Sequence, residues 1–95
     1  MRISELIWSE KVLEKIARKH QLGPAEVEEV LSDPQRKYRF VESGHVKDED
    51  VYLVLGRSDV GRLLVVYFIL KPGNRALVIS ARDATQKERK RYEKK

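Results

Sequence analysis

The sequence has no cysteine, three prolines, five glycines and a single tryptophan among its 95 residues. Without cysteine the chain has no disulfide bonds, no thiol nucleophile and no thiolate ligand for a metal. The longest apolar run, residues 63–70, is far shorter than the roughly 18 residues of a membrane-spanning helix. The N-terminal segment lacks the apolar centre and cleavage site of a signal peptide, so we expect a cytoplasmic protein without a membrane partner.

A chain of this length is expected to form one domain, residues 1–95, with a modest core. Its charged residues are numerous and unevenly distributed along the sequence. The net charge is +5, and its excess gathers in residues 84–95, where six basic residues stand against two acidic ones. This basic pole favours a polyanionic partner, nucleic acid before membrane, although a solvated helix tail explains the charge equally well.

Two helices are expected in the first third of the chain. Ser9 suits the N-cap of a helix that ends near His20, because residues 12, 13, 16, 17 and 20 fall within one arc of a helical wheel. Pro24 suits the first position of a second helix, which Asp33 and Pro34 end. The inward arc of the first helix includes His20, which is more often a hydrogen-bonded core residue than a catalyst.

From residue 37 onward the apolar pattern has the period of two that is typical of strands. Strands are expected at residues 37–42, 51–57, 62–70 and 75–82, with an edge strand possible at residues 3–8. Tight turns, including the type II signal at residues 71–74, indicate an antiparallel sheet. The unbroken apolar run at residues 62–70 predicts a central strand covered on both faces. The pattern therefore predicts an α+β domain with its helices packed on one face of the sheet.

Face parity and helical period also predict the core. In the last strand, residues 77, 79 and 81 should share one face and residues 78, 80 and 82 the other. The residues expected to be mostly buried are Leu13, Ile16, Val27, Leu31, Leu53, Leu55, Val65, Tyr67, Ile69, Leu77 and Ile79.

The last helix is unusually polar. Thr85 and Glu88 fit a capping box, which places the helix start near Thr85. The face that should contact the protein carries Tyr92 as its only sizeable apolar side chain, beside Glu88 and Arg89. Such a helix is not expected to complete a core, although Tyr92 has two open roles, stacking on a base or anchoring the helix to the sheet.

Two arginines end strands near expected turns. Arg82 precedes the N-terminus of the last helix, where its charge and the helix dipole favour an anion between them. An ion pair from Arg82 to Glu88 explains the same pattern. Arg57 ends the second strand of the meander, at the turn of residues 58–61.

These residues belong to segments that resemble a known family. The stretches IWSEKVLEKIARKH, LSDP, LVLGRS, GRLLVVYF and VISARDATQKERKRYE resemble the BrnT toxins, which are RelE-like ribonucleases of type II toxin–antitoxin systems. Gln21 follows Lys19-His20 where the family usually has glycine, so the chain resembles a divergent branch. The resemblance implies a RelE-like fold: two N-terminal helices, a twisted antiparallel sheet of four or five strands and a C-terminal helix.

The resemblance also implies RNA cleavage without a metal or other cofactor, by attack of the RNA's own 2′-hydroxyl. Arg82 and Arg57 would bind the phosphate, because the guanidinium fork matches its oxygens. The implied groups for proton transfer are His20, Glu88 and Tyr92, and those for guiding the RNA backbone are Lys19, Arg89 and Arg91.

The implied partners are RNA and a DNA-binding antitoxin of the ribbon-helix-helix type, joined with the toxin in a heterotetramer. The alternative is a non-catalytic nucleic-acid- or protein-binding module that retains the fold.

Overall fold

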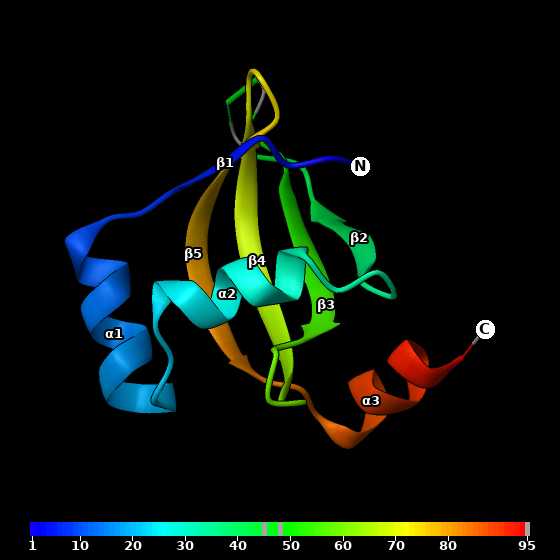
Figure 1. Ribbon diagram of the computed structural model, residues 1–95. Helices are drawn as coiled ribbons and strands as arrows, with labels where there is room; N and C mark the ends of the chain where they lie inside the picture. Colours follow the sequence, from blue (N-terminus) through cyan, green and yellow to red (C-terminus); the bar gives the residue numbers. More distant parts are fainter. Residues whose placement is uncertain (45, 48, 95) are drawn as a thin grey trace.

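A computed structural model of the protein describes residues 1–44, 46–47 and 49–94, so His45, Asp48 and Lys95 lie outside the described residues. Within the described residues the chain forms three helices and five strands, an α+β fold as predicted (Figure 1). In chain order the elements are β1 (Glu5–Ile7), α1 (Glu10–His20), α2 (Pro24–Leu31), β2 (Lys37–Glu42), β3 (Val51–Arg57), β4 (Leu63–Lys71), β5 (Arg75–Asp83) and α3 (Gln86–Glu93).

Local hydrogen bonds explain where the helices begin. The Ser9 hydroxyl accepts the Val12 N–H at 3.2 Å at the start of α1. At α3 the Thr85 hydroxyl accepts the Glu88 N–H at 3.2 Å, and the Glu88 carboxylate accepts the Thr85 N–H at 2.8 Å. Each cap satisfies backbone donors that have no partner within the helix. Both predicted helix starts are confirmed.

The sheet has the strand order β1-β5-β4-β3-β2. β2, β3, β4 and β5 pair antiparallel, and β4 is central as predicted. The short strand β1 joins the edge of β5 in parallel, so the sheet is mixed rather than wholly antiparallel. None of the helices in residues 1–44, 46–47 and 49–94 is long and apolar enough to cross a membrane.

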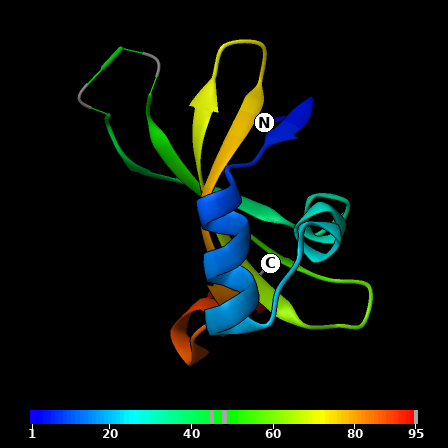
Figure 2. The same ribbon diagram turned by 90° about the vertical axis from the view of Figure 1, so that its left-hand side faces the viewer.

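Helices cover both faces of the sheet, which corrects the prediction that they pack on one face. α1 and α2 lie on one side and α3 on the other, where Figure 2 shows it at the lower left. Tyr92 is only 7% exposed and packs in a second, small core with residues of β3 and β4. Tyr92 therefore docks α3 on the side of the sheet that α1 and α2 leave uncovered. We call these sides the α1–α2 face and the α3 face.

The main core lies on the α1–α2 face. Its largest member, Phe68, packs against Tyr38 and Tyr52, and Val54 and Leu64 are fully buried beside it. The predicted core residues Ile16, Val27, Leu53, Leu55 and Val65 are buried, and Leu13, Leu31, Tyr67, Ile69, Leu77 and Ile79 are partly buried. Among the strand residues, the pattern selected mostly side chains of the α3 face. Because β4 is apolar on both sides, its alternation could not show which side carries the main core.

A bulge in β5 changes which side chains share a face. Tyr67 pairs with Ser80 and Phe68 with Val78, so Ile79 is an extra residue in β5. The predicted alternation of residues 77, 79 and 81 is therefore wrong. Ala81 joins Val78 in the main core, and Arg82 lies across from Val65 on the α3 face.

Gly56 lets α2 pack directly on β3. A Cβ atom at this position would lie 3.0 Å from both the Val30 side chain and the Val30 carbonyl oxygen, too close without movement of the helix. The close approach brings the segment after α2 to the end of β3, where the Asp33 carboxylate accepts the Arg57 N–H at 2.8 Å. The fold thus places Asp33 beside Arg57, which belongs to the candidate site.

Candidate active site

Arg82 forms a forked ion pair with Glu88 on the α3 face. The Nη1–Oε1 and Nη2–Oε2 distances are 2.8 and 2.9 Å, and Nη2 also donates to the Tyr67 hydroxyl at 3.1 Å. The guanidinium carbon lies 5.6 Å from the centre of the Tyr67 ring. Of the two interpretations that the sequence allowed, the ion pair is present: the anion between Arg82 and the start of α3 is the Glu88 carboxylate itself.

The pair changes the acidity of both groups. Hydrogen bonds from Arg82 and from the Thr85 N–H lower the pKa of Glu88 to about 2, because together they outweigh the effect of burial, which raises it. The hydrogen bonds of Arg82 with Glu88 and Tyr67 outweigh burial and raise the pKa of Arg82. Glu88 is therefore ionised near neutral pH and is too weak a base to accept a proton readily from a hydroxyl group. Its contacts suit it to orienting Arg82.

The lowered pKa of Glu88 makes the contribution of this pair to stability depend on pH. Because the folded value of about 2 lies below the ordinary value of 4.5, the contribution is complete above pH 4.5 and is lost as the pH falls toward 2. We expect wild type to unfold at higher urea concentration than Glu88→Gln at neutral pH, with the difference shrinking across this range. A difference that is the same at both ends of the range would contradict the prediction.

Arg57 and Tyr92 form a second cluster on the α3 face, held by Asp33. The Arg57 guanidinium lies over the Tyr92 ring, 5.2 Å from its centre, and donates to the Gly61 carbonyl at 2.8 Å. Tyr92 donates its hydroxyl to Asp33 at 2.6 Å. Burial and this hydrogen bond raise the pKa of Tyr92. Burial alone would raise the pKa of Asp33, but hydrogen bonds from Tyr92 and from backbone N–H groups outweigh it and lower the pKa.

A basic groove runs beside Arg82 between β2 and α3. We define it by two adjoining hollows of about 310 and 250 Å³ that share Arg39, Leu53 and Arg91. Lys37 lines one hollow, and Tyr67 and Glu88 line the other. The Lys37 ammonium donates to the carbonyl oxygens of Arg91 and Lys94 and so ties β2 to the C-terminal end of α3.

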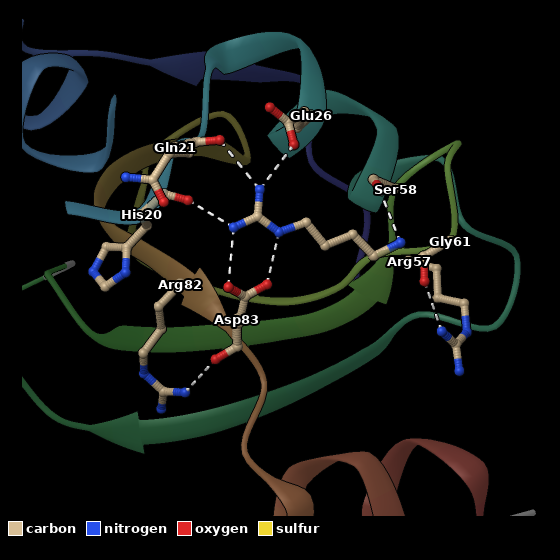
Figure 3. A network of polar contacts seen from close by, with 9 residues as sticks. His20, Gln21, Glu26, Arg57, Ser58, Gly61, Arg82 and Asp83 are labelled. Carbon is tan, nitrogen blue, oxygen red and sulfur yellow. Dashed lines mark hydrogen bonds and ion pairs between the residues drawn. The ribbon is translucent and has the colours of Figure 1, made fainter. Parts of the chain in front are cut away.

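His20 belongs to a different network, centred on Arg62. The Arg62 guanidinium pairs with Asp83 at 2.7 Å and donates to the His20 and Gln21 carbonyls at 2.6 and 3.1 Å. The network joins the end of α1 to the end of β5 (Figure 3). Hydrogen bonds from Arg62 lower the pKa of Asp83, and His20 adds a smaller charge effect.

The structure therefore brings the predicted site residues together in pairs. Arg82 meets Glu88, and Arg57 meets Tyr92, but Figure 3 shows the guanidinium groups of Arg57 and Arg82 well apart, with His20 apart from both. The expectation that the two arginines and His20 reach one phosphate is not met, because Arg82 turns toward Tyr67 and Arg57 toward Tyr92.

The residues predicted to guide the RNA backbone lie on two different faces of the sheet. Arg91 lines the basic groove. Arg89 is partly buried on the same helix. Lys19 is exposed near the end of α1, which packs on the opposite face of the sheet.

A family model described as the ribonuclease toxin BrnT of type II toxin–antitoxin systems matches residues 8–88. The chain belongs to the BrnT family. A search of curated proteins finds no match. Among solved structures, the crystal structure of the Brucella abortus ribonuclease toxin BrnT is similar, with a TM-score of 0.62 and 24% sequence identity. The similarity covers 86% of this chain and 97% of that one, and at this identity it supports the fold.

The sequence patterns of this BrnT-family chain did not indicate several residues of the candidate site. Tyr67 was assigned to the core, although its parity with Val65 in β4 places it on the face of Arg82. Arg39 alternates with the aromatic residues of β2, which is the signal that could have placed it on the α3 face. Asp33 was interpreted only as a helix stop, and no local pattern indicates its contact with Tyr92, 59 positions away.

Proposed function

We propose that the chain is the toxin of a type II toxin–antitoxin pair and acts as a metal-independent endoribonuclease. The observation that carries the proposal is a charged guanidinium, Arg82, fixed by Glu88 and Tyr67 next to the basic groove. Arg39, Arg91 and Lys37 line this groove and supply positive charge along the path of a phosphate backbone. Its lining also includes Leu53 and the Tyr67 ring, on which a base can stack.

Arg82 is assigned the role of stabilising the scissile phosphate. Attack by the 2′-hydroxyl, whose proton passes to a water molecule, places extra negative charge on the phosphate oxygens, and a fixed guanidinium lowers the energy of that state without reorganising. Tyr67 accepts a hydrogen bond from Arg82, so its own O–H can donate to a phosphate oxygen or to the departing 5′-oxygen. Glu88 acts as a positioning residue, because its lowered pKa makes it a poor base.

The other candidates take different places in this proposal. Arg91 guides the backbone together with Arg39, and Arg89 adds positive charge on α3. Arg57 and Tyr92 belong to a neighbouring subsite rather than to the scissile phosphate. His20 and Lys19, at the end of α1, are assigned no part in the chemical step.

The direct test is cleavage of a single-stranded RNA by the purified, antitoxin-free chain in the presence of EDTA. We expect endonucleolytic products with 2′,3′-cyclic phosphate ends, because the 2′-hydroxyl is the nucleophile. Cleavage that EDTA abolishes and added Mg²⁺ restores would overturn the metal independence. An absence of products from folded protein would overturn the enzymatic role.

A second function, non-catalytic binding of nucleic acid or protein, is favoured by one observation. Four hydrogen bonds of the Arg82 guanidinium are directed at Glu88, Tyr67 and the Asp83 carbonyl, as in a structural ion pair. A binding module would retain RNA on the basic groove without cutting it. Binding and cleavage measured on one labelled RNA separate the two functions.

Partner binding gives a further prediction. We propose a DNA-binding antitoxin of the ribbon-helix-helix type that covers the basic site and forms a heterotetramer with the toxin. Cells that express the intact chain alone are expected to grow poorly, whereas co-expression with the antitoxin should restore growth and yield a stable complex. Growth is measured after induction, with Arg82→Ala as the control. Vigorous growth with abundant folded wild-type chain would contradict the prediction.

A further inference from the structure

A hollow beside Arg57 has a lining unlike that of the basic groove. It measures about 400 Å³, and its lining includes Arg57, Tyr92 and three acidic residues, Glu29, Asp33 and Asp59. Asp33 already accepts three hydrogen bonds, from the Tyr92 hydroxyl and from the backbone N–H groups of Arg57 and Gln35. One Glu29 oxygen accepts the Asp59 N–H at 3.0 Å, which fixes that carboxylate at the wall. We call this the Arg57 hollow.

The charge of the Arg57 hollow selects against a phosphate. Three carboxylates against one guanidinium make the lining net negative, and a phosphate there would be repelled. A neutral group that offers N–H donors to a carboxylate and acceptor atoms to a guanidinium is favoured instead. A nucleobase has this chemistry on its edges.

The arrangement of donors and acceptors favours one base. Guanine presents two acceptors, O6 and N7, on one edge, and this edge is the commonest specific partner of an arginine fork. Its adjoining edge carries two N–H donors, N1–H and the N2 amino group, which match a carboxylate. Arg57 has five N–H donors and uses one on the Gly61 carbonyl, so others remain for a ligand. Glu29 supplies the carboxylate.

We propose that the Arg57 hollow is a guanine-binding subsite that selects the nucleotide next to the scissile phosphate. The proposal rests on the proposed ribonuclease function and names the specificity of the same site. Glu88 and Tyr92, which contact Arg82 and Arg57 respectively, are four residues apart on α3. That separation is about 6 Å along a helix axis, comparable to one nucleotide step of an extended strand.

The test uses uridine-rich RNAs that carry a single guanosine, adenosine or cytidine at one position. Wild type is expected to cleave next to guanosine about tenfold faster than next to the other bases. Glu29→Gln should lose this preference, because an amide whose oxygen accepts the Asp59 N–H presents its NH₂ donor toward the N–H groups of guanine. Glu28→Gln, the same change at the exposed neighbouring position of α2, should keep the preference.

Modified bases assign the contacts. Inosine lacks the amino group and should slow wild type but not Glu29→Gln. The 7-deazaguanine base lacks N7 and should slow wild type but not Arg57→Lys, which keeps the charge without the fork. Equal wild-type cleavage at all four bases, or a preference that survives both variants, would overturn the subsite.

A wild-type chain that cleaves none of these RNAs would contradict the proposed function, and the subsite is then tested by binding. Titration with guanosine monophosphate should shift the NMR signals of the Arg57 side chain and the Tyr92 ring, whereas adenosine monophosphate should not. Equal shifts with the two nucleotides, or none, would overturn the guanine assignment independently of catalysis.

Discussion

Replacing Arg82 by alanine is expected to lower the rate of RNA cleavage by about 10²–10³-fold, the usual cost of removing one donor to a transition-state oxyanion. The guanidinium lies on the α3 face, pairs with Glu88 and contributes no side-chain volume to either core. The loss should therefore appear in the chemical step, measured by single-turnover cleavage at saturating protein, while the circular dichroism spectrum stays that of wild type.

Two variants test the interpretation of this loss. Arg82→Lys keeps the charge but cannot form the fork to Glu88, so we expect a partial loss. Lys94→Ala removes an exposed cation near the end of α3 and should leave the chemical step unchanged. Weaker binding at high salt would fit either proposed function, because both involve phosphate contacts. Equal rates for wild type and Arg82→Ala would exclude Arg82 from catalysis.

Replacing Phe68 by alanine is expected to cost about 3–5 kcal/mol of the free energy of unfolding. Phe68 is 1% exposed, and its ring stacks on Tyr52 and meets Tyr38 edge-on, at centroid distances of 6.0 and 6.3 Å. Removal of the ring leaves a cavity in the middle of the main core that α1 and α2 cannot fill. Urea unfolding followed by circular dichroism measures the change.

The matched control is Val60→Ala, at a residue that is 87% exposed in the turn before β4. Its free energy of unfolding should stay within about 0.5 kcal/mol of wild type. Phe68→Ala acts on the α1–α2 face, so its folded fraction should cleave RNA at the wild-type rate. A loss below about 1 kcal/mol would mean that the core around Phe68 collapses to fill the space.

Local signals in the sequence were enough to predict the elements of this fold. Ser9 and the Thr85–Glu88 capping box mark helix starts through hydrogen bonds that span only three residues. The period of two located the strands of the meander, and the apolar run of β4 identified the central strand. Each of these features depends on neighbours in the chain, so composition and spacing were sufficient.

The relations between faces could not be predicted in the same way. β4 is apolar on both sides, so parity could not decide which side carries the main core. The contacts of the candidate site join distant positions, such as Tyr92 with Asp33 and Lys37 with the Arg91 carbonyl. The site was therefore predicted as one cluster, whereas the packing of α3 divides it into separate pairs.

Because β5 carries one extra residue at Ile79, the face of the sheet on which Arg82 lies depends on the bulge. If the same residues paired regularly from Val78 onward, without the bulge, Arg82 would lie opposite Leu64 and its guanidinium would point through the sheet toward α1, although every side chain of the motif would remain. Two related sequences can thus share the same Ile-Ser-Ala-Arg letters and present the arginine to opposite surfaces. Comparison of relatives should accordingly weigh the pairing register of β5 as heavily as its composition.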